Sequence, residues 1–242
     1  MEGQSFEEQH ETPKPETGPE VDIEVESVLE KREIESVEQL QRYFKISVVK
    51  LKDDGQAMFK ETSDNFVSHH HLFLRSELEL IAARIDKRLG FGLVPPTVTR
   101  TIKGCAGVLQ ERIFAKVASQ VINWEYFVDD LWLAKAAVFD YLIDNRDRHD
   151  GNFLIDPSTG RMWLIDHDYL SLIIGGSEQK EVLKKARDKN LTQLSEDMKE
   201  SLRLLLADID SLKQGIDHVE VVEFVEGVKT RAQALLNKGT LA

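Results

Sequence analysis

Two clusters of acidic and amide side chains stand on either side of a predicted β-hairpin. The first is Asp147–Asn152, which follows the most apolar stretch of the chain, and the second is Asp166–Asp168. Between them, two short apolar runs flank residues 156–160, whose Asp, Pro, Ser and Gly are typical of a turn. Because the two strands of a hairpin lie side by side, we expect Asn152 and Asp166 to meet at its open end. This convergence constrains the fold more than any other feature of the sequence.

The side chains at this open end are hard oxygen donors. Carboxylate and amide oxygens suit Mg²⁺ when it holds phosphate oxygens, so Asn152 and Asp166 are predicted metal ligands. Asp147 precedes them in the loop and is placed to orient or deprotonate an attacking hydroxyl, as phosphoryl transfer requires. The alternative is that the carboxylates cap a turn and pair with Arg146 and Arg148. Two clusters on one hairpin favour the metal site.

The front of the chain has the pattern of a small antiparallel sheet. Asp54-Gly55 lies between two apolar runs, which is the strongest short-range signal for a hairpin. Apolar residues recur at helical spacing further on, and Val94-Pro95-Pro96 indicates an extended entry to another strand. The predicted strands are 46–51, 57–60, 97–102 and 108–113, and the predicted helices are 26–42 and 72–89.

The back of the chain has a helical pattern. Residues 124–145 are apolar nearly all round, which is typical of a buried helix. From about residue 177 onward, leucines and isoleucines follow a helical stripe. The sequence therefore predicts an α+β fold in two lobes. The expected divisions are a disordered acidic tail over 1–25, an N-lobe over 26–113, and a helical C-lobe over 114–242.

Charge and composition exclude several classes of protein. The net charge is −12, and residues 1–40 carry 13 acidic and 3 basic residues, so the rest is close to neutral. Neither a nucleic-acid partner nor a membrane surface is expected without a basic excess. Residues 1–25 are either a solvated leader or a docking segment for a partner. The single cysteine, Cys105, suits a reducing compartment, and no membrane span or standard secretory signal is found, so a cytoplasmic location is expected.

A lysine and a glutamate add to the acidic hairpin. Lys60 ends a predicted strand, and Glu77 lies on the next predicted helix. Such a pair can aim the lysine at a nucleotide phosphate. Lys-Glu pairs usually lie on surfaces and mean little alone. The chain order of lysine, helix glutamate, strands, buried helix, acidic loop and acidic strand end is the order of a kinase. His69–His71 is expected to be a solvated loop or to line the nucleotide site.

The segment 139–168 resembles the catalytic core of the atypical kinases, which include the phosphatidylinositol 3-/4-kinase-like group, the actin-fragmin kinase and the HipA-type toxin kinases. The run from Asn145 to Asn152 is similar to their Asn-x-Asp-Arg-His-x-x-Asn loop, and Ile165-Asp166-His167 stands where many kinases have Asp-Phe-Gly. Residues 76–77, 89–97 and 107–110 are similar to the helix, strand entry and strand before the adenine-binding hinge. The resemblance covers roughly residues 44–175 and implies a two-lobed, protein-kinase-like fold with an antiparallel-sheet N-lobe.

The resemblance also implies roles for individual residues. Asp147 is the implied catalytic aspartate, with His149 as a possible co-catalyst. ATP with Mg²⁺ or Mn²⁺ is the implied cofactor, held through the two metal ligands named above. The remaining implied nucleotide contacts are Lys60, positioned by Glu77, and the backbone of Glu111 and Ile113.

The sequence departs from the family pattern in three places. There is no Gly-x-Gly-x-x-Gly before Lys60, Asp166 is followed by His-Asp rather than Phe-Gly, and few residues remain for an activation loop. Three functions stay open. The first is a Ser/Thr protein kinase with an unidentified protein substrate, the second is a phosphoinositide kinase, and the third is a nucleotide-binding pseudokinase that serves as an interaction module.

Overall fold

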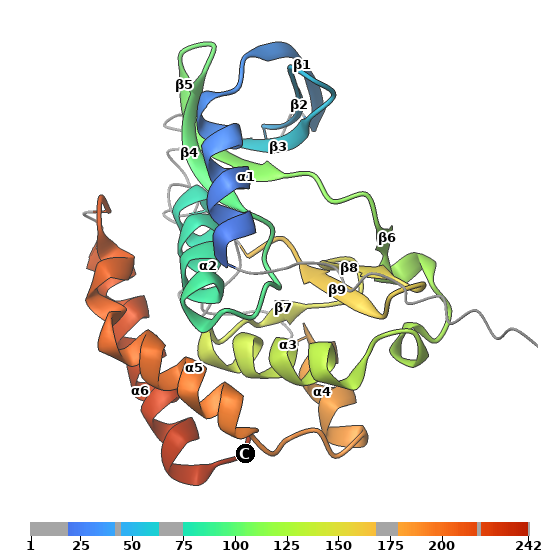
Figure 1. Ribbon diagram of the computed structural model, residues 1–242, viewed down its shortest axis with the longest axis vertical. Coiled ribbons are helices and arrows are strands. Elements are labelled where there is room, and N and C mark those ends of the chain that lie inside the picture. The colour runs from blue at the N-terminus through green and yellow to red at the C-terminus, as the bar shows by residue number, and fades with distance from the viewer. Residues whose placement is uncertain (1–18, 42–44, 63–74, 168–178, 217–218, 242) are drawn as a thin grey trace, which may run out of the picture.

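The chain folds as a strand-rich part followed by a helical part (Figure 1). The computed structural model describes residues 19–41, 45–62, 75–167, 179–216 and 219–241. The α+β class, with a small antiparallel sheet ahead of a helical part, is confirmed. Of the expected acidic tail, residues 1–18 lie outside the described ranges, as does His69–His71.

The first part is built on a five-stranded sheet in the order β1-β2-β3-β5-β4, and every neighbouring pair is antiparallel. The turn between β2 and β3 contains Asp53 and Asp54, both in the left-handed region that short polar side chains tolerate. The hairpin predicted from Asp54-Gly55 is therefore confirmed. The bounds are β1 Ile34–Gln41, β2 Ile46–Leu51, β3 Gln56–Glu61, β4 Thr97–Ile102 and β5 Cys105–Glu111.

The two faces of this sheet have different partners. One face packs on helix α1 (Pro19–Lys31), because Leu29 joins a buried apolar cluster with residues from four of the strands. The other face carries Lys60 on β3, directly opposite Val108 on β5. Val108 belongs to a second core that contains the buried apolar residues of helix α2 (Arg75–Leu89). The alternation of side chains along β3 thus points Lys60 away from α1 and towards α2. The α1-side cluster is Leu29, Val49, Leu51, Ala57, Phe59, Val98, Ile102 and Leu109.

Helix α2 is tied to the helical part of the molecule. Arg84 Nη1 donates to the carbonyl oxygens of Leu212 (2.9 Å) and Gln214 (2.8 Å). One turn further on, Arg88 forms an ion pair with Asp208 at 2.7 Å. The apolar residues of α2 lie in the core that the helical part also supplies. The helix therefore holds a fixed place between the sheet and the C-terminal helices.

The helical part surrounds the predicted acidic hairpin. Strands β8 (Phe153–Asp156) and β9 (Arg161–Leu164) pair as the predicted hairpin, with Phe153 opposite Leu164, and β6 (Lys116–Val117) joins the outer side of β8. Helix α3 (Asp130–Leu142) lies beneath them (Figure 1). It is shorter than the expected 124–145, because Asp129 caps its first turn by accepting from Leu131 N–H at 2.7 Å. The remaining elements are β7 Asp147–Arg148, β10 Gln179–Lys180, α4 Glu181–Asp188, α5 Glu196–Ala207 and α6 Val219–Lys238.

Among the described residues, no helix combines the length and the apolar character that crossing a membrane requires.

The helix expected over 26–42 is wrong in its second half. Helix α1 ends at Lys31, and β1 then pairs with β2. Ile34 and Val37 are three residues apart, which resembles helical spacing, yet both pack on the sheet core. A register shift between Ile34 and Ser36 inserts an extra residue, so the two side chains return to one face of a strand. A bulge and a helix therefore leave the same apolar spacing in the sequence.

Gly107 on β5 offers a test of how tightly the central strands approach. A Cβ at this position would lie 2.4 Å from the Lys60 carbonyl oxygen and 2.7 Å from the Phe59 ring. We expect Gly107→Ala to push β5 from β3 and to lower the free energy of unfolding by about 1–3 kcal/mol, measured by urea denaturation. The neighbouring exposed substitution Ala106→Ser should change the stability by less than about 0.5 kcal/mol. Equal stabilities for the two variants would contradict this packing.

Candidate active site

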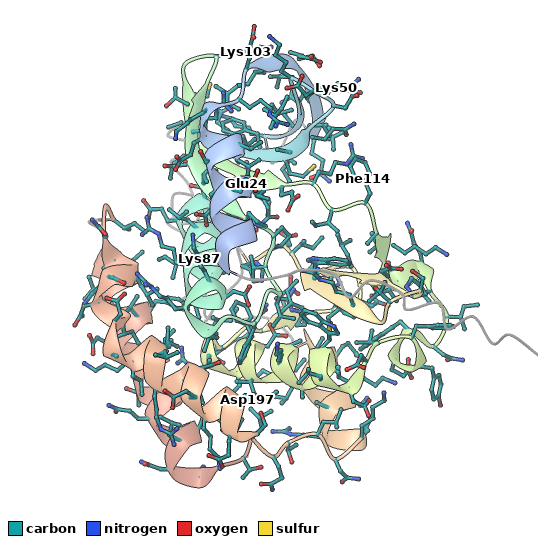
Figure 2. All side chains as sticks on the ribbon, viewed as in Figure 1. Glu24, Lys50, Lys87, Lys103, Phe114 and Asp197 are labelled. Atoms are coloured by element: carbon teal, nitrogen blue, oxygen red, sulfur yellow. The ribbon has the colours of Figure 1, made fainter. Side chains whose placement is uncertain are left out.

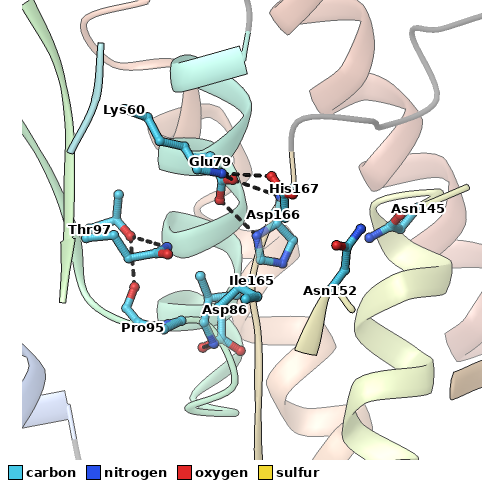
Figure 3. Close-up of polar contacts among 12 residues, drawn as sticks. Lys60, Glu79, Asp86, Pro95, Thr97, Asn145, Asn152, Ile165, Asp166 and His167 are labelled. Carbon is cyan, nitrogen blue, oxygen red and sulfur yellow. Dashed lines mark hydrogen bonds and ion pairs between the residues drawn. The ribbon is translucent and has the colours of Figure 1, made fainter. Parts of the chain in front are cut away.

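Lys60 links the sheet to helix α2 and to the residues that follow strand β9. Its Nζ forms an ion pair with Glu79 on α2 and another, at 2.8 Å, with Asp166 Oδ1 directly after β9 (Figure 3). The Glu79 side chain is 1% exposed, whereas that of Asp166 is 45% exposed. The structure therefore brings together a lysine and an aspartate that lie far apart in the sequence, as the kinase interpretation requires.

The glutamate that holds Lys60 is Glu79, which corrects the expectation for Glu77. Residues two apart on an α-helix point to nearly opposite sides, because each residue advances by about 100°. Lys60 Nζ forms ion pairs with Glu79 and with Asp166. Glu77 lines a separate cavity of about 280 Å³ on another side of α2, together with Thr62 and Ser76. Glu77 and Glu79 lie at about 100° on either side of the apolar stripe of α2, so helical periodicity alone does not distinguish them.

His167 completes the surroundings of Glu79. Its backbone N–H donates to Glu79 Oε1 at 2.9 Å, and its ring Nδ1 lies 3.1 Å from Glu79 Oε2. Burial raises the pKa of Glu79, but the charge of Lys60 and the hydrogen bond from His167 outweigh it and leave the pKa well below the usual range. Burial lowers the pKa of His167, although its bond to Glu79 opposes this. The pair is therefore an ionised carboxylate and a neutral imidazole, with the proton on Nδ1.

The loop from Asp147 to Asn152 holds its own shape. Asn152 Nδ2 donates to the Asp147 carbonyl oxygen at 2.9 Å and approaches Asp147 Oδ2 at 3.4 Å. Asn145 Oδ1 accepts from the backbone N–H of Asp147 at 2.9 Å. These bonds fix the Asp147 backbone and leave its carboxylate about one third exposed, at 36%. An acid held this way is accessible to an attacking hydroxyl.

His149 lies beside Asp147. Its Nδ1 accepts from the backbone N–H of Gly151 at 2.9 Å, so the neutral ring carries its proton on Nε2. Nε2 is 4.0 Å from Asp147 Oδ2. The predicted pair of catalytic residues is therefore adjacent, with the imidazole at the edge of the carboxylate.

Arg148 attaches this loop to the rest of the site. Its guanidinium is fully buried, and Nε donates to both carboxylate oxygens of Asp140 on α3, each at 3.1 Å. Nη1 donates to the carbonyl oxygens of Asn152 and, at 2.8 Å, Ile165. A charge this deeply buried needs such partners. Pairing of Arg148 with the loop carboxylates was the alternative expected from the sequence, but its carboxylate partner is Asp140. The position of Asp140 inside an apolar helix was the available signal.

The predicted adenine-binding residues lie at the end of β5. Glu111 N–H donates to the Pro96 carbonyl oxygen at 2.9 Å, and Ile113 follows just beyond the strand. Gln110 is buried on the same face as Lys60, and its Nε2 donates to Thr97 Oγ1 at 3.0 Å. The chain thus leaves the sheet at a defined point beside the Lys60 face.

The oxygen donors at the open end of the hairpin fit a divalent cation. Because the Asn152 amide nitrogen is used by Asp147, its oxygen lies on the side of Asp166 and His167 in Figure 3. An amide oxygen and a partly exposed carboxylate are typical Mg²⁺ ligands when phosphates complete the coordination. No group of three or more His, Cys, Asp or Glu gathers at one point among the described residues.

The chain shares features with known kinases. The family model for phosphatidylinositol 3- and 4-kinases matches residues 107–214. Two crystal structures of the Golgi casein kinase are similar, one of them with Mn/ADP bound. Each is 16% identical and covers 90% of this chain and 75% of its own, with TM-scores of 0.53 and 0.55. The proinflammatory kinase CtkA of Helicobacter pylori is 14% identical over 86% of this chain and 97% of its own, with a TM-score of 0.47. No curated protein matches the sequence.

The fold is therefore similar to that of the Golgi casein kinase, with a small antiparallel sheet followed by a helical part. The matched segment contains the acidic loop and the hairpin, so the family model and the structural neighbours both show a similarity to the atypical protein-kinase-like superfamily. The resemblance noted from the sequence is confirmed.

The neutral His167 predicts a pH dependence of stability. Its folded-state pKa lies below the ordinary value of 6.5, so below that pH the unfolded chain takes up a proton that the folded chain does not. The stability is then lost as the pH falls, by up to about 1.4 kcal/mol per pH unit. We expect wild-type protein to lose more unfolding free energy than His167→Asn between pH 7 and pH 5, measured by urea denaturation. Parallel pH profiles would contradict a buried neutral histidine.

Proposed function

We propose that the chain is an ATP-dependent phosphotransferase and, within that class, a Ser/Thr protein kinase. The observation that carries the proposal is the bridge of Lys60 between Glu79 and Asp166, with Asp147 and Asn152 fixed at the other side of the same hairpin end. A lysine, a catalytic aspartate and two oxygen donors are the parts that phosphoryl transfer from ATP uses.

One set of residues binds the nucleotide and its metal, and another binds the acceptor hydroxyl. Lys60 binds the nucleotide phosphates, since Glu79 fixes the direction of its amine. Asn152 and Asp166 hold Mg²⁺ or Mn²⁺, which when bound neutralises charge on the phosphate oxygens. The adenine lies against the backbone from Glu111 to Ile113. Mn/ADP in a Golgi casein kinase structure supports a nucleotide with a divalent metal for this fold.

Asp147 serves the acceptor. Its carboxylate orients the attacking hydroxyl and accepts its proton as the new bond to the γ-phosphorus forms. The bond between that phosphorus and the β–γ bridging oxygen breaks, and ADP leaves. His149 supports this step, because its Nε2–H lies at the edge of the Asp147 carboxylate. An amino-acid hydroxyl is the proposed acceptor, supported by the near-neutral main part of the chain and by the protein-kinase neighbours.

Substitution of the proposed lysine, catalytic aspartate and metal ligand tests whether these residues carry out phosphoryl transfer. We expect Lys60→Met, Asp147→Asn and Asp166→Asn each to lower the release of labelled phosphate from Mg-ATP by about a hundredfold or more. Asp150→Asn is the matched control, since it removes one exposed carboxylate from the same loop, and it should stay within about twofold of wild type. Circular dichroism checks that all four variants fold. Full activity of Asp166→Asn would refute the proposal.

A phosphoinositide kinase is the second candidate, and the family model over residues 107–214 favours it. The absence of a basic excess in the sequence counts against an anionic membrane surface. The two candidates share every residue named above and differ only in the hydroxyl that Asp147 receives.

The acceptor can be identified directly. The protein is incubated with γ-labelled Mg-ATP, a cell lysate, and vesicles of phosphatidylcholine containing phosphatidylinositol. We expect phosphoserine or phosphothreonine by mass spectrometry and no label in the lipid extract. Label in the lipid alone would establish the second candidate. Tight ATP binding without transfer to either would instead indicate a pseudokinase.

A further inference from the structure

The carboxylate of Glu79 is held at both of its oxygens. Oε1 accepts from Lys60 Nζ and from the backbone N–H of His167, and Oε2 faces the Nδ1 of the same histidine (Figure 3). Two donors from one residue define the plane of a carboxylate as well as its position. His167 therefore determines in which direction Glu79 presents its charge to Lys60.

The ring of His167 has no exposure with which to serve another role. It is 0% exposed, and it packs nearly perpendicular to the Phe139 ring at a centroid distance of 5.8 Å. Its Nε2 has no hydrogen-bond partner among the described residues. A buried polar atom without a hydrogen bond costs free energy, and an apolar ring at this position would carry no such atom. Packing alone therefore does not account for a histidine here. The Nδ1–H bond to Glu79 is the contact that an apolar ring could not make.

We propose that His167 is a positioning residue for phosphotransfer: its Nδ1–H fixes Glu79, and Glu79 in turn aims Lys60. This inference rests on the proposed function. The contacts form a closed circuit of Lys60, Glu79, His167 and the adjacent Asp166, which returns to Lys60 at 2.8 Å. A rotation of Glu79 would then disturb the lysine and, through it, the metal-binding aspartate.

Two substitutions of His167 distinguish the effect of its hydrogen bond to Glu79 from the effect of its side-chain volume. Asparagine carries a side-chain N–H near the position of Nδ1 but fills less space, whereas phenylalanine fills the space without a donor. The backbone N–H bond to Glu79 remains in both. A positioning role predicts that His167→Asn is the more active variant, and a packing role predicts the reverse order.

The test measures turnover of Mg-ATP with the full chain. We expect kcat/KM for Mg-ATP of His167→Asn to stay within about threefold of wild type, and that of His167→Phe to fall about tenfold to a hundredfold, as for a lost bond to a charged group. In a Glu79→Gln background, the additional effect of His167→Phe should largely disappear. Activity of His167→Phe equal to or above His167→Asn, or additive effects of the two substitutions, would overturn the inference.

A spectroscopic measurement keeps this inference separate from the proposed function. In protein labelled with ¹⁵N-histidine, the buried Nδ1–H should give a slowly exchanging NMR signal that is absent from His167→Asn and shifted in Glu79→Gln. Absence of the signal from wild type would overturn the inference whatever the activity. If the signal is present but wild type neither binds nor turns over Mg-ATP, the phosphotransferase proposal fails, and the catalytic role of His167 fails with it.

Discussion

The site depends on one buried guanidinium. Arg148 joins Asp140 on α3, the carbonyl oxygen of Asn152 in the acidic loop, and that of Ile165 at the end of β9. Removing one partner of such a buried ion pair lowers the free energy of unfolding by about 3–5 kcal/mol, so Arg148 and Asp140 cannot be replaced singly without a large loss of stability. The loop that carries the proposed catalytic aspartate and the strand end that carries Asp166 are consequently parts of one rigid unit.

The surroundings of Lys60 are organised in a different way. Lys60 comes from the sheet, Glu79 from α2, and Asp166 and His167 from beyond β9 (Figure 3). Figure 2 shows the described side chains of the whole molecule on the ribbon. Asp166 takes a left-handed backbone conformation with φ of 59°. This turn lets one residue direct its carboxylate to Lys60 while the next directs both of its donors to Glu79. The backbone conformation of Asp166 thus lets Asp166 and His167 contact the two members of the Lys60–Glu79 ion pair.

The local elements could be predicted from sequence because their signals are local. Asp54-Gly55 defines a hairpin, and Asp156–Gly160 defines another, so β2, β3, β8 and β9 lie near their expected positions. The convergence of Asp147, Asn152 and Asp166 follows from the second hairpin. Glu79 was missed because two glutamates occur in one helix, and only its orientation against the sheet distinguishes them. Strand β1 was missed because its bulge imitates helical spacing.

The attachment of α2 has a consequence for how the molecule can open. Arg84 and Arg88 bind the helix to segments near Asp208 and Leu212, far along the chain. On its other side, α2 is joined to the sheet by the ion pair of Lys60 with Glu79 and by the 2.7 Å hydrogen bond between Thr62 and Ser76. The helix is therefore attached to both parts of the molecule. A change in the angle between the sheet and the C-terminal helices would require one of these two sets of contacts to break.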